Sequence, residues 1–251
     1  MSGNGPFLAR VSGEVKGNVT LRKQQYRISD NTEQSIKLAR NFITGKVYNC
    51  RWVLERAVRD YSLRIDTDSI KKKSKILYQS LEKIRTCKTS AQLLGLEGEA
   101  AAVYFSVFDE LILQQKEDFT FQGRNRRPPL DNVNAMLSFA YSLLTGMCGS
   151  ALESVGLDAY VGFFHTDRPG RISLALDIME ELRSIMADRF VLTMINKRII
   201  KKSHFIQKES GAVVLTDEGR KLFLSAWQER KKELITHPFL DEKIEWGKVN
   251  E

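Results

Sequence analysis

The stretch Leu94-Gly-Leu-Glu-Gly-Glu-Ala-Ala-Ala-Val-Tyr-Phe105 predicts a helix that carries one acid on its apolar face. We expect this helix to begin near Glu97 and to run to about residue 113. Steps of three and four residues from Glu97 reach the stripe that should face the core, whereas Glu99 falls on the opposite side. The stripe consists of Ala101, Tyr104, Phe108 and Leu111. A buried carboxylate needs a cation, a proton or a hydrogen-bond donor beside it, so Glu97 is a candidate metal ligand.

Long helical patterns on both sides of this stretch predict a mainly α-helical fold. Apolar residues recur at helical spacing, with cap-like residues at several ends, over 33–60, 68–86, 131–155, 174–190 (or on to 200) and 216–234. The segment 114–130 is a polar loop. A small β-hairpin is expected near 204–215, because Ser210 and Gly211 separate two short apolar runs.

The N-terminal residues show a different pattern. The runs 7–11 and 19–28 alternate well enough to predict two strands, separated by glycines. Two strands alone are barely stable and belong to a larger sheet. We therefore expect residues 1–30 to be the C-terminal part of a β domain and residues 31–251 to form one large α-helical domain.

Composition limits the class of protein. The 251 residues are 42% hydrophobic, enough for a sizeable core, and no stretch approaches the roughly 20 apolar residues of a membrane span. The chain has no signal-peptide pattern and only isolated cysteines, so we expect the reducing cytoplasm. Lys and Arg number 39 against 31 Asp and Glu, a net charge of +8 that favours a polyanionic partner such as nucleic acid.

A histidine and a second acidic helix accompany Glu97. His165 precedes a Pro-Gly turn, and the helix after it carries Asp177, Glu180 and Glu181 at spacings of three and four residues. Taken singly, these are a structural histidine and a solvated acidic face. Together with Glu97 they form a set of oxygen ligands and one imidazole, which suits Mg²⁺ or Mn²⁺. In a basic protein such an ion points to phosphodiester chemistry.

Several motifs, in order along the whole chain, resemble the universal CRISPR-associated integrase family, a metal-dependent DNA endonuclease that inserts new spacers into CRISPR arrays. The sequences of these motifs are most similar to those of the type I-C branch. The resemblance includes Gly17-Asn-Val-Thr-Leu-Arg22, Leu94-Gly-Leu-Glu-Gly98, Arg127-Pro-Pro-Leu-Asp-Asn-Val-Asn134, Gly162-Phe-Phe-His165, Arg168-Pro-Gly-Arg171 and Ser173-Leu-Ala-Leu-Asp-Ile-Met-Glu-Glu-Leu-Arg183.

The resemblance implies a set of ligands for Mg²⁺ or Mn²⁺. The family's Glu of the Glu-Gly-x-x-Ala-x-x-Tyr motif matches Glu97, its histidine before the Pro-Gly turn matches His165, and its third ligand matches Glu180. Asp177 is implied as a supporting or alternate ligand, and Glu181 is a less favoured substitute. For DNA contacts the matched motifs nominate Arg124, Arg126, Arg127, Arg168 and Arg171, each of which could equally be an ordinary surface arginine. Tyr104 lies two turns from Glu97 and is either a site residue or a core tyrosine.

The family also implies an assembly and a reaction. Its members dimerise through the β domain, and two dimers flank a small ferredoxin-like CRISPR adaptation subunit. A prespacer 3′-hydroxyl then attacks the repeat backbone. Family members continue before Phe7 and beyond Glu251, so we expect a chain truncated at both ends, with its ligands kept and its dimer weakened. The alternatives are a stand-alone divalent-metal DNA nuclease and a catalytically inactive DNA-binding scaffold.

Overall fold

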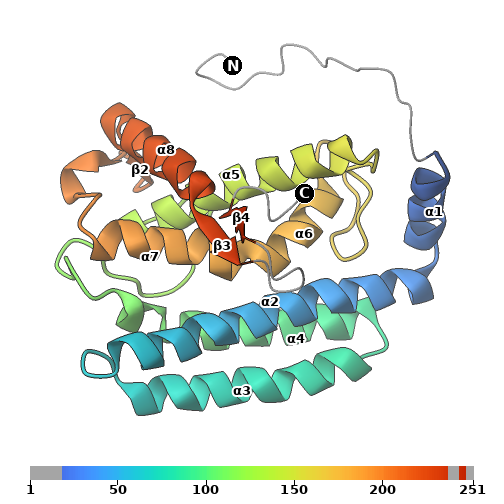
Figure 1. Ribbon diagram of the computed structural model, residues 1–251, viewed down its shortest axis with the longest axis horizontal. Coiled ribbons are helices and arrows are strands. Elements are labelled where there is room, and N and C mark those ends of the chain that lie inside the picture. The colour runs from blue at the N-terminus through green and yellow to red at the C-terminus, as the bar shows by residue number, and fades with distance from the viewer. Residues whose placement is uncertain (1–18, 237–242, 247–251) are drawn as a thin grey trace.

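The computed structural model describes residues 19–236 and 243–246, and its longest element is the helix α2, Thr32–Tyr61 (Figure 1). The helix begins after Asn31, whose side chain accepts a hydrogen bond from the backbone N–H of Gln34 (3.0 Å). One face of α2 is buried along its length. That face consists of Ile36, Ala39, Ile43, Lys46, Val47, Cys50, Val53, Leu54 and Ala57. Lys46 is the one charged residue in it.

Two groups of helices pack on α2 from different sides (Figure 1). α3, Thr67–Thr86, and α4, Ser90–Phe105, pack against it and against each other. On the other side lies α6, Ser173–Arg183, which also packs against α5, Asn132–Ser154. The predicted mainly α-helical fold is therefore confirmed, and α2 is the element that brings α4 and α6 together.

The helix that carries Glu97 differs in its bounds from the prediction. α4 begins at Ser90, where Thr89 caps it by accepting a hydrogen bond from the N–H of Gln92 (3.2 Å). It ends at Phe105, and a separate 3₁₀ turn, Phe108–Leu111, follows it. The glycines and Glu97 therefore lie inside the helix and not at its start.

The helix expected from residue 174 onwards contains a π-helical turn. α6 continues directly into the π turn Ser184–Asp188 and then into α7, Arg189–Asn196. A π turn holds one more residue than an α turn, so the sequence spacing of the buried residues in α6 is shifted by one residue in α7. The acidic face of α6 points inward: its buried residues include Asp177 and Glu180. The interpretation of this face as a solvated acidic surface is wrong.

α5 is a helix of the core. It runs from residue 132 to 154, close to the predicted range 131–155, without the break that Gly146 or Gly149 could have caused, and it packs against α6, α7 and β2. By length and apolar composition it also passes the test for a membrane-spanning helix within the described residues. Its buried residues, which include Met136, Leu144 and Cys148, show that its apolar character serves the interior of the fold.

Two small antiparallel sheets complete the structure. β1, Phe205–Gln207, pairs with β2, Val213–Leu215, which confirms the hairpin predicted near 204–215. α8, Asp217–Lys232, follows β2 after the N-cap Thr216. A second pair, β3, Leu234–Thr236, and β4, Lys243–Glu245, had no counterpart in the predictions.

The strand predicted over 19–28 is wrong, and the strand predicted over 7–11 lies outside the described residues. The chain forms a helix, α1, Val19–Asp30. Its contacts follow helical spacing and reach the loop before His165. The donors are Arg22 (to Gly156 O, 2.9 Å), Gln25 (to Asp158 O, 2.7 Å, and Val161 O, 2.9 Å), Tyr26 (to Asp158, 2.9 Å) and Ser29 (to Gly162 O, 3.2 Å). The alternation of apolar residues over 19–28 predicted a strand, but polar side chains at helical spacing make the contacts of this segment.

Candidate functional site: two acids around Lys46

Lys46 of α2 lies between two acids that come from two other helices. Its side chain is 2% exposed, and its ammonium pairs with Oε1 of Glu97 from α4 and lies 2.6 Å from Oε2 of Glu180 from α6. The expectation that Glu97 needs positive charge beside it is met by a lysine. Three helices that are distant in sequence thus meet at one buried ion-pair cluster.

Glu180 has a second cation beside it. Nη1 of Arg183, one turn further along α6, donates a hydrogen bond to Oε1 of Glu180 (3.0 Å). Burial alone would raise the pKa of Glu180, but the positive charges of Arg183 and Lys46 outweigh it and lower the pKa to about 2. Glu180 is therefore ionised at neutral pH despite its burial.

Gly45 allows α6 to approach α2 closely enough for this contact. A Cβ at Gly45 would lie 2.7 Å from Cγ of Glu181, which no side chain tolerates without movement. Asn49 fixes the same crossing, since its Nδ2 donates to the backbone oxygen of Glu181 (2.8 Å). The side chain of Glu181 therefore lies against the α2 backbone at Gly45, while Glu180 faces Lys46. This arrangement favours Glu180 over Glu181 as the third site acid.

Asp177 holds the loop that carries His165. Its side chain is fully buried and accepts hydrogen bonds from the backbone N–H groups of Phe163 (2.7 Å), Phe164 (3.0 Å) and His165 (2.9 Å). Its Oδ1 also lies 2.7 Å from Nδ1 of the His165 ring. A proton on Nδ1 satisfies this contact and leaves Nε2 with its lone pair for another ligand.

Gly162 places this loop directly on the first turn of α6. A Cβ at Gly162 would lie 2.8 Å from Cβ of Ser173 and 3.0 Å from Oδ2 of Asp177. Ser29 of α1 holds the other side, because its hydroxyl donates to the backbone oxygen of Gly162. The position of His165 thus depends on α1, on this glycine and on Asp177 together.

Glu97, Glu180 and His165 are of the residue types that bind a hard divalent ion, and Lys46 lies between the two acids. Among the described residues no three His, Cys, Asp or Glu side chains come together as a bound metal requires. Two contacts account for this: the ammonium of Lys46 separates Glu97 from Glu180, and Asp177 is committed to the loop. Yet Oε2 of Glu180 is buried with the Lys46 ammonium 2.6 Å away, and Glu180 lies close enough to His165 for the two side chains to interact electrostatically. Two carboxylates and one imidazole are ligands that Mn²⁺ and Mg²⁺ accept.

Arg124 has a structural role in the fold. Its guanidinium donates to Oδ1 of Asn134 (2.7 Å) and to the hydroxyl of Ser138 (3.1 Å), and it stacks 5.2 Å from the centre of the Tyr141 ring. Burial lowers its pKa. Asn134 is itself fully buried and also accepts a hydrogen bond from the backbone N–H of Asn125 (3.1 Å). Arg124 therefore fastens the predicted polar loop to α5.

The other nominated arginines lie at the surface to different degrees. Arg126 and Arg127 are exposed in the loop before α5, and Arg168 is exposed in the turn after His165. Arg171 is half-buried, and its backbone N–H donates to the oxygen of Arg168 (3.0 Å). Exposure is what a DNA contact requires, so these four stay candidates.

Tyr104 is a core residue, and the suggestion that it reaches a substrate is wrong for this structure. Its side chain is 1% exposed and packs edge-on against Phe105 (5.1 Å between ring centres) and Phe108 (5.8 Å). Burial, and then the charge of Asp188, raise its pKa well above the ordinary value. Asp188 accepts a hydrogen bond from the hydroxyl of Tyr141 (2.6 Å), so a buried polar network lies behind the site.

Lys46 and Arg183 were missed by the sequence reasoning, although a signal for Lys46 was present. It lies three residues after Ile43 and seven after Ala39, on the apolar stripe predicted for α2. A lysine on such a stripe, like the acid Glu97, needs a partner of opposite charge or a hydrogen-bond acceptor beside it. Arg183 gave no comparable signal, since a basic residue in the last turn of a helix is ordinary.

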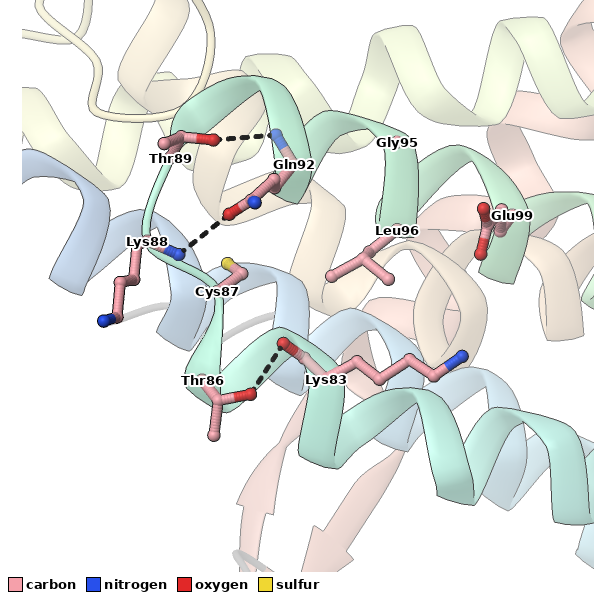
Figure 2. A pocket seen from close by; sticks show the side chains of 9 residues that line it. All are labelled: Lys83, Thr86, Cys87, Lys88, Thr89, Gln92, Gly95, Leu96 and Glu99. Carbon is pink, nitrogen blue, oxygen red and sulfur yellow. Dashed lines mark hydrogen bonds between the residues drawn. The ribbon is translucent and has the colours of Figure 1, made fainter.

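One open surface pocket, of about 770 Å³, lies between α3 and α4, and none of the site residues described above lines it. Its lining residues include Lys83, Cys87, Gln92 and Glu99, which Figure 2 labels. Glu99 lines it and Glu97 does not, which confirms that the two acids lie on different sides of α4.

Comparisons with known proteins identify the family of the chain. The model of the family described as CRISPR associated protein Cas1 matches residues 1–229. CRISPR-associated endonuclease Cas1 2 of Rhodospirillum rubrum is 51% identical over 249 residues, which cover 98% of this chain and 72% of the relative. A solved structure of a casposase bound to integration product has a TM-score of 0.78 at 28% identity, over 93% of this chain and 62% of the casposase.

A further solved structure, a partial Cas6-RT-Cas1–Cas2 complex, has a TM-score of 0.73 at 26% identity and covers 83% of this chain. This chain spans 61% of the matched chain in that complex, so it corresponds to less than two thirds of either solved neighbour. The family match nevertheless extends over most of the sequence. The chain belongs to the CRISPR-associated protein Cas1 family.

Proposed function

We propose that this chain is a divalent-metal-dependent DNA endonuclease and integrase of CRISPR adaptation, which joins the 3′-hydroxyl of a prespacer to a phosphodiester of the CRISPR repeat. The observation that carries the proposal is the convergence of Glu97 and Glu180, from helices far apart in sequence, on one buried cation. A relative named as an endonuclease and a fold shared with a casposase bound to integration product support it.

The residues of the chain divide the work. Glu97, Glu180 and Nε2 of His165 would hold the Mg²⁺ or Mn²⁺ ion, which when bound polarises the scissile phosphodiester and stabilises the leaving oxygen. Asp177 orients the His165 ring through Nδ1, and Arg183 holds Glu180 ionised and aligned. Joining exchanges one P–O bond for another, so it needs no external energy source. Hydrolysis replaces the attacking hydroxyl with water.

The partners follow from the same proposal. DNA would lie along the exposed arginines Arg126, Arg127 and Arg168 and the half-buried Arg171, in keeping with the net charge of +8. A small ferredoxin-like adaptation subunit would bridge copies of the chain, and the copies would pair as homodimers. The Cas1–Cas2 complex among the solved neighbours supports an adaptation partner. The setting would be bacterial or archaeal cytoplasm.

The decisive experiment compares Glu97→Gln with its matched control Glu99→Gln on the opposite side of α4. Cleavage of plasmid DNA and joining of a labelled oligonucleotide with a free 3′-hydroxyl are measured with Mn²⁺, with and without the small subunit. We expect the wild type and Glu99→Gln to cleave and join, and Glu97→Gln to lose about 100-fold or more, since even outer partners of metal ligands matter 10- to 100-fold.

Each other outcome points to a different function. Cleavage without joining would favour a stand-alone nuclease, and DNA binding without either reaction would favour a scaffold. Full activity of Glu97→Gln would remove Glu97 from the site and with it the proposal.

A further inference from the structure

Lys46 stands where the proposed ion would have to bind. Its ammonium touches the two oxygens, Oε1 of Glu97 and Oε2 of Glu180, that face each other across the site. A metal bridging these acids would use the same oxygens. Ammonium and divalent ion therefore compete for one set of ligands, and two cations cannot occupy that position together.

The pair formed with Glu180 is not required to neutralise that acid. Arg183 already donates to Oε1 of Glu180, and its guanidinium is held 5.2 Å from the centre of the Tyr141 ring. Oε2, the other oxygen of Glu180, lies 2.6 Å from the ammonium of Lys46. Arg183 is thus a fixed partner of Glu180, whereas the ammonium of Lys46 is shared between Glu180 and Glu97.

The two cations also differ in their freedom to move. An arginine offers a rigid planar fork, while a lysine is a point charge on a flexible four-carbon stem. Lys46 can withdraw by rotating its stem, and Arg183 cannot leave without losing both the carboxylate and the aromatic ring. The replaceable cation is Lys46.

We propose that Lys46 is a built-in competitor of the metal, which holds Glu97 and Glu180 in position in the metal-free protein and is displaced when the ion binds. This inference rests on the proposed metal site. In the metal-free protein Lys46 prevents two buried carboxylates from repelling each other. When the metal binds, the free energy needed to displace Lys46 is subtracted from the favourable free energy of metal–ligand contacts. The affinity for the ion is therefore lower than the ligands alone would give.

The test is the Mn²⁺ dissociation constant, measured by electron paramagnetic resonance without DNA. The variants are Lys46→Met, which keeps the length and removes the charge, and Lys46→Gln, which keeps donors for the carboxylates should the first variant not fold. Lys37→Met is the control, because Lys37 is an exposed lysine of the same helix. We expect Lys46→Met and Lys46→Gln to bind Mn²⁺ about tenfold more tightly or better, about 1.4 kcal/mol, and Lys37→Met to bind as the wild type does.

A crystal structure of the Mn²⁺-loaded protein separates displacement from a mere change in charge. We expect Nζ of Lys46 to lie more than about 4 Å from both carboxylates, beyond ion-pair distance. An ammonium still paired with Glu97 beside a bound ion would overturn the inference.

The failure of this inference differs from the failure of the proposed function. If Glu97→Gln weakens Mn²⁺ binding and neither Lys46 variant strengthens it, the metal site stands and competition by Lys46 is wrong. If Glu97→Gln leaves Mn²⁺ binding unchanged, the metal site itself is wrong.

Discussion

Nδ1 of His165 lies 2.7 Å from Oδ1 of Asp177, and the same carboxylate accepts three backbone hydrogen bonds from the loop that carries the histidine. One buried acid therefore sets both the tautomer of the ring and the path of the chain that leads to it. Two acids of α6 thus have different roles. Asp177 acts on the site through His165, whereas Glu180 faces Lys46 in the site itself.

Asp177→Asn is expected to weaken Mn²⁺ binding and DNA cleavage by about 10- to 100-fold, the usual effect of losing an outer partner of a metal ligand. The amide cannot accept all the hydrogen bonds of the carboxylate, so unfolding in urea should also become easier by about 1–3 kcal/mol. Asp167→Asn is the control, because Asp167 accepts a hydrogen bond from Gly162 at an exposed position. Equal losses in both variants would assign Asp177 to loop stability alone.

Arg126 and Arg127 are expected to contact DNA phosphates. The double variant Arg126→Ala/Arg127→Ala should weaken duplex binding and reduce the slope of log K against log salt by about 1.8, at about 0.9 per lost phosphate contact, with unchanged thermal stability. Arg124→Ala should instead lower the melting temperature, because it releases Asn134 and Ser138. Fluorescence anisotropy over a series of salt concentrations measures the slope. An unchanged slope in the double variant would exclude these two arginines from the interface.

Gly45→Ala is expected to disturb the crossing of α2 and α6. The new Cβ would meet Cγ of Glu181 at 2.7 Å, so overpacking should cost about 1–3 kcal/mol and exceed the gain in helix propensity of about 1 kcal/mol. Gly95→Ala in α4 has open space around it and should stabilise the protein by about 0.5–1 kcal/mol. Urea unfolding measures both.

The double variant Gly45→Ala/Glu181→Ala should recover the loss, since it removes the atoms that collide. If the Gly45→Ala protein were as stable as Gly95→Ala, the crossing of α2 and α6 would have room for the additional Cβ, and the predicted overpacking would be wrong.

Asp188→Asn is expected to change how stability depends on pH. Burial raises the pKa of Asp188 above its ordinary value of 3.8, although Arg183 and Tyr141 act in the opposite direction. The folded protein thus binds this proton more tightly than the unfolded chain does. The contribution to stability is complete below pH 3.8 and is lost as the pH rises through the folded pKa. The stability of Asp188→Asn relative to wild type should therefore increase from about pH 3 to pH 7, as followed by urea unfolding. A relative stability that falls over this range would contradict the assignment.

The long helices could be predicted because each has its own signals. α2 and α5 begin after side chains that cap them, Asn31 and Asp131, and each has recurring apolar residues that are buried, such as Ile43 in α2 and Leu144 in α5. α1 could not be recognised, because its partners are backbone groups of the loop from Gly156 to Gly162, over 130 residues away in sequence. Local alternation carries no information about such contacts.

The candidate site, too, could be predicted from the sequence only in part. Periodicity separates Glu97 from Glu99 and groups the acids of α6, but it does not say which face meets solvent. That depends on the partners of each acid: Lys46 and Arg183 lie beside Glu180, and backbone N–H groups bond to Asp177. The third acid was ambiguous in the sequence because Asp177, Glu180 and Glu181 share one side of a helix. Only the packing of α6 on Gly45 and on the histidine loop gives each a different neighbour.

The π-helical turn Ser184–Asp188 makes this part of the chain sensitive to its length. It accommodates one additional residue between the acids of α6 and the apolar residues of α7, such as Val191 and Ile195. A deletion of one residue there would convert the π turn into a regular α turn and leave both halves facing their partners. An additional residue between Glu180 and Val191 would instead turn one half against the other by about 100°, and either the acids would lose Lys46 or the core would lose α7. This segment should therefore tolerate the loss of one residue better than the gain of one.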